Sequence, residues 1–353
     1  MDANEELGLE EEVGLGLGLV VEVRRKERLF RDRCNPFDCP EDTFRQLYRL
    51  PKLSVLDICH EIGPFLRRQT KRSQAVQVPL QICITLNFFA SGTFQYVLGQ
   101  SFGLSQPTVS QVIKHVTRSI IRSMNRHITF PMDRESQILI QQQFFRKFQF
   151  PRIIGAIDGT HVAIKAPSVD EHVYVNRKSY HSINVQAICD SNLKFLDVVA
   201  KYPGSCHDSF ILSNSTIGQR FQDGLIPNGL LIGDSGYPLR EWLMVPINNP
   251  TTEDERNYND MHASARNVIK HCFGVMKSRF RCIHRSGGNL QYSPKRCCEI
   301  IMAVAILHNM TIHIPLLPEE EIEIDLVEDD ARQPQHVAGA NAARQELIRQ
   351  LAQ

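Results

Sequence analysis

Residues 155–161 read Gly-Ala-Ile-Asp-Gly-Thr-His. The apolar run Ile153 to Ile157 leads into this motif, and its length and composition predict a short buried strand that ends at Asp158. Val162 to Ile164 is expected to continue as a strand after the polar break. In open α/β sheets, ligands and catalytic groups collect at strand ends, where side chains project from a rigid edge. The motif therefore predicts an α/β domain with a functional aspartate at the edge of its sheet.

Further strands and two helices follow this motif. The expected strands cover residues 183–189, 195–200, 230–232 and 242–247. A long helix is expected from about Glu255 to Arg281, because its apolar side chains fall on one stripe. Pro294 then opens a last apolar helix over residues 300–310. Together these elements predict a mixed α/β domain.

Two more aspartates occupy places like that of Asp158. Asp208 follows the strand expected at 195–200, and Asp234 ends the strand expected at 230–232. Converging carboxylates repel one another unless a cation lies between them, and Mg²⁺ and Mn²⁺ prefer such oxygen ligands. Two such ions roughly 4 Å apart activate water for in-line attack on phosphorus. Phosphodiester cleavage is the reaction that fits this cluster. The alternative is ordinary turn and cap chemistry, since Asp before Gly or Ser is common in turns.

The first half of the chain has helical periodicity. Helices are expected from Glu41, over residues 53–62 and over residues 80–90, with Gly63-Pro64 ending the second and Ser91-Gly92 ending the third, which should be buried. The pattern stays helical to about Phe150.

A helix-turn-helix is expected within this half. Thr93 to Phe102 forms the first helix, Gly103 permits a left-handed turn, and Ser105 caps a second helix with Pro107 in its first turn. An apolar stripe leaves polar side chains outward that are of the types that contact DNA phosphates and base edges. These DNA-binding candidates are Gln106, Thr108, Ser110, Gln111 and Lys114. The alternative is a helical bundle that contains such a turn without touching DNA.

Charge is segregated along the chain. Residues 1–23 hold seven acidic and no basic residues, residues 24–150 hold 20 basic and 9 acidic residues, and residues 316–353 hold three Arg and nine acidic residues. A basic body between acidic ends favours a polyanionic partner such as DNA. A basic cluster within this body either binds phosphates, serves nuclear import or is a solvated loop. It consists of Arg67, Arg68, Lys71 and Arg72.

No feature of the sequence predicts a membrane or disulfide-linked protein. No apolar run reaches the roughly 18 residues that span a bilayer, and the acidic N-terminus lacks the basic start of a signal peptide. The ten cysteines lack paired C-x-x-C spacing and are expected to be reduced core thiols. Cys272, Cys282 and His284 match no standard zinc module. We therefore expect an intracellular protein without a membrane partner.

Several ordered motifs from about residue 40 to about residue 315 resemble the DDE domain of harbinger transposases and the nucleases derived from them. The resemblance implies an RNase H-like fold and a DNA nuclease that uses Mg²⁺ or Mn²⁺, present in nucleus and cytoplasm. It also implies a Myb-like partner protein that assists nuclear entry and DNA targeting. The matching motifs are Gly155–Lys165, 175–178, 181–185, 203–209, 233–238 and Leu307-His-Asn309.

Carried over onto this chain, the family's metal ligands are Asp158, Asp208 and Asp234, with Asp158 and Asp234 as catalytic residues. The family's fourth acid is a glutamate in Val-Ile-Glu-x-x-Phe on the long helix, where this chain has Lys270. A protonated lysine cannot ligate a hard cation and competes with it. We expect Lys270 to pair with Asp158 or Asp234 and to lower metal affinity. Glu299 and Asp260 are the other acids nearby, and neither matches the family's position.

The same helical face is expected to carry further basic side chains, either for DNA phosphates or as a solvated face. These are Arg266, Lys277 and Arg281. His161 and His207 flank two aspartates, and structural hydrogen bonding is their expected role, with orientation of water as the alternative.

The sequence therefore divides into four segments. Residues 1–40 are a poorly ordered N-terminus, 41–150 a helical domain with the helix-turn-helix, 151–315 an RNase H-like domain with a mixed sheet flanked by helices, and 316–353 an acidic tail with a short helix over 340–351. Two functions follow. The first is a transposase-derived, metal-dependent DNA nuclease. The second is a DNA-binding and partner-binding protein whose cleavage is impaired because of Lys270.

Overall fold

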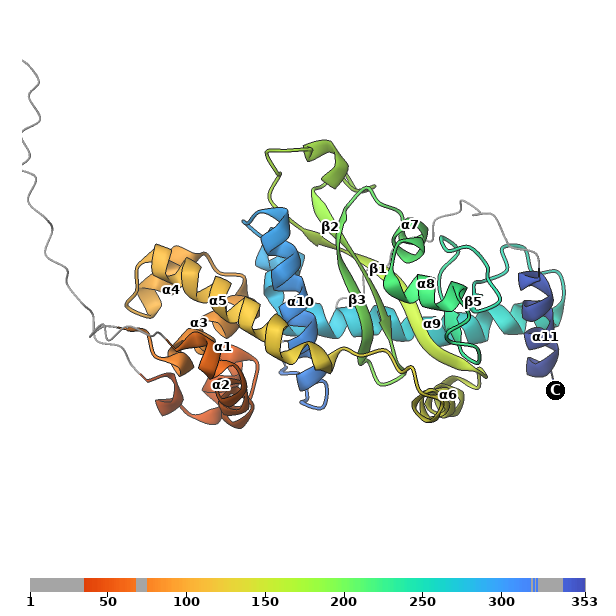
Figure 1. Cartoon of the computed structure of the whole chain (residues 1–353), viewed down its shortest axis with the longest axis horizontal. Coiled ribbons are helices and arrows are strands. Elements are labelled where there is room, and N and C mark those ends of the chain that lie inside the picture. Colours follow the sequence, from red (N-terminus) through yellow and green to blue (C-terminus); the bar gives the residue numbers. More distant parts are fainter. Residues whose placement is uncertain (1–34, 68–74, 319, 321, 323–338, 353) are drawn as a thin grey trace, which may run out of the picture.

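The computed structural model describes residues 35–67, 75–318, 320, 322 and 339–352. A helical half lies at one end, a twisted sheet lies in the middle, and the long helix α9 runs along the molecule to α11 at the far end (Figure 1). The expected α/β architecture with a mixed sheet flanked by helices is confirmed. Most of the expected disordered N-terminus, and Arg68, Lys71 and Arg72 of the basic cluster, lie outside the described residues.

The helical half is built around α3, whose side chains are almost all buried. Gly92 ends α3 at φ +71° and Gly103 forms the turn before α5 at φ +63°, as the left-handed geometry of both corners requires. The helix-turn-helix pair is therefore present as α4 and α5. The helices of this half are α1 (Glu41–Tyr48), α2 (Lys52–Leu66), α3 (Val78–Ser91), α4 (Gln95–Ser101), α5 (Gln106–Met124) and α6 (Arg134–Phe148).

Helix α2 does not end at Gly63-Pro64, as expected from the sequence. It runs on to Leu66 with Pro64 inside its last turn. Proline lacks the N–H that would donate to the carbonyl oxygen of His60 four residues earlier, so the helix loses one internal hydrogen bond at Pro64. Ile62 and Leu66 are buried on either side of Pro64, and their packing outweighs that loss.

The sheet has the order β3-β2-β1-β4-β5. Strand β1 pairs antiparallel with β2 and parallel with β4, β2 pairs antiparallel with β3, and β4 pairs parallel with β5. The fifth strand is shorter than the expected 242–247. The strands are β1 (Ile153–Ala163), β2 (Ser182–Cys189), β3 (Phe195–Pro203), β4 (Leu230–Ile232) and β5 (Leu243–Met244).

Strand β1 corrects the expectation that Asp158 ends a strand. It continues through Asp158 and Gly159 to Ala163, paired residue by residue with β2. A charged residue and a glycine are poor strand formers, and the continuous pairing with β2 overrides that local preference. Asp158 therefore lies in the middle of the central strand.

Helices cover the sheet and connect it to the helical half. Helix α9 packs against β1, β2 and β4, while α10 packs against both β3 and α5. The helix expected at 340–351 is present as α11, packed against α9 through Leu347 and Ile348. These helices are α7 (Asp208–Ser213), α8 (Thr216–Gln222), α9 (Glu253–Arg279), α10 (Pro294–Thr311) and α11 (Ala340–Leu351).

The nine cysteines in the described ranges are free thiols, in agreement with the expected reduced core. Cys272 donates to the backbone oxygen of Leu193 at 3.0 Å and lies beside His308, whose pKa burial lowers to about 4. Among the described helices, none has the length and apolarity to cross a membrane.

Candidate active site

The pairing of β1 with β4 places two aspartates at the same level of the sheet. Ala156 of β1 lies opposite Ile232, the last residue of β4. Asp158 follows two residues later within β1, and Asp234 follows two residues past the end of β4. Asp158 is 8% exposed, and Asp234 is half-buried. The structure thus brings together the two predicted catalytic residues.

Asp208 begins α7 and reaches β1 at Gly159. A Cβ atom at position 159 would collide with both carboxylate oxygens of Asp208, so only glycine lets this carboxylate lie against the strand. Successive residues of a strand point to opposite faces. Asp208 therefore approaches β1 from the face opposite to the side chain of Asp158.

Strand β2 holds Asp208 in this position. The Asn184 side-chain amide donates to Oδ1 of Asp208 at 2.8 Å. The Gln186 amide donates to the backbone oxygen of Asp208 at 2.8 Å and to the Tyr237 hydroxyl at 2.9 Å. Asn184 and Gln186 are buried side chains two residues apart, so they share one face of β2. This network fixes α7 on the sheet and places a buried phenol beside the carboxylates.

The acidic side chains of the site disfavour one another's charged forms. Burial, then the charges of Asp234 and Asp208, raise the pKa of Asp158 to about 8, although Arg266 and the Gly159 N–H lower it. Burial and the same three carboxylates raise the pKa of Tyr237 well above its ordinary range. Like charges at this spacing favour protonation or a bound cation.

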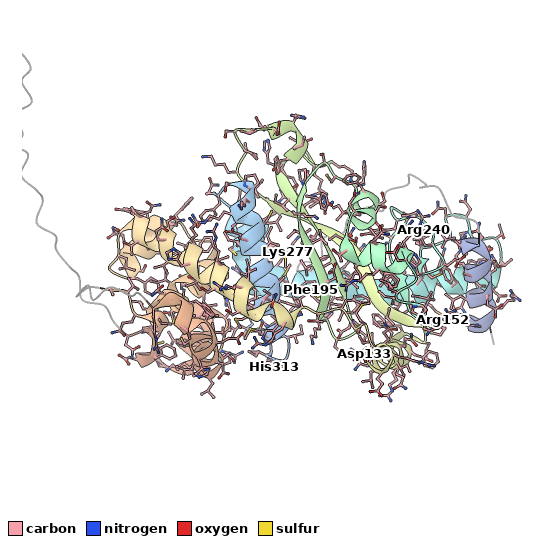
Figure 2. All side chains as sticks on the ribbon, in the orientation of Figure 1. Asp133, Arg152, Phe195, Arg240, Lys277 and His313 are labelled. Atoms are coloured by element: carbon pink, nitrogen blue, oxygen red, sulfur yellow. The ribbon has the colours of Figure 1, made fainter. Side chains whose placement is uncertain are left out.

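Helix α9 supplies positive charge to the face of β1 that carries Asp158. Arg266 is 7% exposed, and its charge lowers the pKa of Asp158. Lys277, which is labelled in Figure 2, is 5% exposed. It donates to Thr160 Oγ1 at 2.7 Å, so that it ties α9 to β1. Thr160 is two residues from Asp158 and shares its face of the strand. The expected basic face of α9 therefore packs against β1, and Arg266 and Lys277 are not solvated there.

Lys270 does not form the expected pair with Asp158 or Asp234. It lies on the same helical stripe as Arg266 and Lys277, half-buried, and makes no ion pair with a described residue. Arg266, one turn earlier, is the cation that acts on Asp158. The sequence could have indicated Arg266 as this cation, because it lies four residues before Lys270 and residues four apart on a helix share a face.

Nearby acids do not replace the missing glutamate. Glu299 forms an ion pair with Arg118 of α5 at 3.0 Å. Asp260 is exposed near the start of α9.

The aspartates supply the oxygen ligands that Mg²⁺ and Mn²⁺ prefer, and their mutual repulsion fits a bound cation. Within the described ranges, however, no three Asp, Glu, His or Cys side chains are gathered closely enough to share one ion. The position of Asp208 across β1 from Asp158 explains this separation. The role of Asp208 as a third ligand stays a prediction.

A cavity of about 460 Å³ opens beside these residues. Asp208 and Asp234 line it together with His161, Asn184 and Arg177, of which Arg177 is exposed. The His161 ring contacts the Ser182 hydroxyl at 3.0 Å, which favours the structural role expected for this histidine. Sequence reasoning missed Asn184 and Gln186 as site residues, because nothing local distinguishes a polar residue inside a strand.

The second helix of the helix-turn-helix is less free than expected. Arg296 of α10 donates to the backbone oxygen of Ser110 at 2.7 Å, so that Ser110 faces α10 and not solvent. Thr108 contacts the Ser105 hydroxyl at 2.9 Å and is half-buried, as is Lys114. The exposed candidates are Gln106 and Gln111, with Arg67 directly after the end of α2.

Comparisons with known proteins match most of this chain. Residues 157–309 match the family model described as DDE superfamily endonuclease. The Bos taurus and Homo sapiens proteins named "Putative nuclease HARBI1" are each 34% identical over 319 residues, 86% of this chain and 91% of theirs. The Arabidopsis thaliana protein named "Protein ALP1-like" is 27% identical over 76% of this chain and 70% of its own. No solved structure matches.

Proposed function

Because the chain belongs to the family of harbinger transposase-derived nucleases, we propose that it cleaves DNA phosphodiester bonds with a divalent cation held by Asp158 and Asp234. Endonucleases of this superfamily generally use divalent metals. The observation that carries the proposal is that the neighbouring strands β1 and β4 bring Asp158 and Asp234 to one level of the sheet, where burial and the charge of Asp234 raise the pKa of Asp158. We propose Asp208 as the third carboxylate, on the cavity side.

Each residue around the cluster has a distinct part in this proposal. A bound cation would activate water and offset charge on the phosphate. Asp158 from β1 and Asp234 from the segment after β4 would supply ligand oxygens, and Asn184 orients Asp208. Arg266 offsets carboxylate charge from α9. Lys277 is a positioning residue that fixes β1 through Thr160.

The second candidate function is DNA binding without efficient cleavage. Lys270 favours it, because a cation on the inner stripe of α9 opposes metal binding at the position where the family has an acid. Both functions predict DNA binding that weakens as salt rises. The Myb-like partner and the distribution between nucleus and cytoplasm also stay proposals from the family likeness.

A plasmid assay separates the two functions. Purified protein is incubated with supercoiled plasmid with and without Mn²⁺, beside Asp158→Asn and a matched control, Asp197→Asn. Asp197 of β3 is also a carboxyl whose pKa burial raises, to about 6, and no other carboxylate contributes to that shift. We expect nicking that needs Mn²⁺ and falls by at least about 100-fold in Asp158→Asn only. Intact DNA binding without nicking would favour the second function.

A further inference from the structure

A second, larger cavity lies between the helical half and the nuclease half. Its volume is about 900 Å³, within the range of ligand-binding clefts. One wall is the corner between α3 and α4, residues 91–96, and the other is the segment 286–292. At its floor the two backbones meet, because a Cβ at Gly92 would lie 2.6 Å from the carbonyl oxygen of Gly287. The cleft is therefore built into the junction of the two halves.

This cleft is connected to the candidate active site by strand β1. Leu290 of the cleft wall donates its N–H to the oxygen of Ala163, and its own oxygen accepts from Lys165, both at 3.0 Å. Asp158 lies five residues before Ala163 on the same strand. At about 3.3 Å per residue, the cleft begins about 17 Å from Asp158, the rise of about five base steps.

Aromatic and amide side chains dominate the cleft. Phe94 and Tyr96 are 71% and 65% exposed and are the two most exposed aromatic rings among the described residues. Gln106 of α5 donates to Gln95 at 2.7 Å, and Gln95 donates to the Tyr292 hydroxyl at 2.7 Å. Aromatic rings stack on nucleobases, and amides hydrogen-bond to base edges.

The charges around the cleft suit a polyanion. None of its lining residues is Asp or Glu. Arg296 lies over the Tyr292 ring at 4.4 Å, and Lys295 and Arg285 are exposed beside the cleft wall in sequence. Sites that hold single strands combine aromatic rings that stack on bases with basic side chains that contact the backbone. Here the rings line the cleft and the basic side chains lie beside it.

We propose that this cleft binds unpaired bases of single-stranded DNA and aligns the strand with the carboxylates along β1. This assignment rests on the proposed function in one respect, that DNA is the ligand. Phe94 and Tyr96 stack on bases, Gln106 contacts base edges from the first turn of α5, and the basic residues contact the backbone.

Fluorescence anisotropy with a labelled oligothymidine tests the site. Wild-type full-length protein is compared with Phe94→Ala, Tyr96→Ala and the double variant. The matched control is Phe145→Ala, which removes a ring that is 48% exposed on α6. We expect each cleft variant to bind about tenfold more weakly, the double variant to lose roughly 100-fold, and the control to match wild type. A 2-aminopurine base within the oligonucleotide should be quenched by wild type and not by the double variant.

The outcomes separate this site from the proposed function. Wild-type affinity in the double variant, with plasmid nicking intact, would overturn the cleft assignment alone and leave the exposed rings to a protein contact. If the double variant loses oligothymidine binding and wild type nicks no plasmid, the result would support the cleft as a DNA-binding site and contradict the proposed nuclease activity. Absence of any DNA binding by wild type would overturn both.

Discussion

The carboxylate cluster and the α5–α10 interface are two polar regions that differ in how their charges are arranged. In the cluster, like charges are buried together, and Arg266 offsets them only in part. At α5–α10, opposite charges meet near solvent, as in the Arg118–Glu299 pair. The first region stores electrostatic energy that a ligand can release, whereas the second only fixes two elements relative to each other. A single substitution should therefore matter far more in the first.

The largest expected effect is on stability without metal. Asp158→Asn should raise the free energy of unfolding by about 3–5 kcal/mol near pH 8. The folded pKa of Asp158, about 8, lies above its ordinary value of 3.8, so ionisation in the unfolded state removes stability as pH rises from 3.8 to 8. The gain should vanish below about pH 3, where the carboxyl is protonated in both states. Thermal unfolding across this pH range measures it, with Asp197→Asn showing a smaller gain that levels off near pH 6.

Arg266→Gln should lower the free energy of unfolding. Removal of a buried cation from beside carboxylates should cost about 2–4 kcal/mol at neutral pH. Arg256→Gln is the control on the same helix, because its pair with Glu253 is exposed and contributes less than about 1 kcal/mol. Urea unfolding of both variants measures the difference, and equal losses would contradict the role given to Arg266.

Lys270→Glu tests whether an acid at the position of the family's glutamate restores metal binding. An acid on the inner stripe of α9 should raise Mn²⁺ affinity about tenfold and increase plasmid nicking. Arg256→Glu makes the same two-unit change of charge at an exposed position of the same helix. Calorimetric titration with Mn²⁺ compares the two, and an equal gain in both would mean that only net charge had changed.

The smallest expected effect lies on α5. Gln111→Ala should weaken duplex DNA binding by about fivefold, the loss of one polar contact to DNA. Ser110→Ala should leave binding unchanged, because Ser110 is turned toward Arg296. Duplex anisotropy distinguishes them, and a larger loss for Ser110→Ala would mean that α10 moves away from α5.

Much of this fold could be predicted from local patterns. The bounds of β4 and α11, the start of β3 and the left-handed turn at Gly103 follow from apolar runs and from glycine's conformational freedom. The course of β1 through Asp158 could not be predicted, because pairing with β2 decides it. The same holds for Pro64 inside α2, where tertiary packing outweighs a local signal.

The candidate residues of the site could be named from the sequence, but their arrangement could not. Asp158 and Asp234 meet because β1 and β4 are neighbours, a fact of topology. That Asp208 lies across β1, and that Ser110 faces α10, depends on which face of an element another element covers. Sequence spacing gives the stripe on α9 but not which of its cations reaches the carboxylates.

Proton release on metal binding tests whether Asp158 and Asp234 share a cation. Mn²⁺ is titrated into metal-free protein at about pH 6.5 and about pH 9.5, in buffers of different ionisation enthalpy. Since the pKa of Asp158 is about 8, wild type should release about one proton per ion at the lower pH and almost none at the higher, and Asp158→Asn should release none. Binding without proton release at the lower pH, or unchanged binding by Asp158→Asn, would contradict a cation site at this carboxylate.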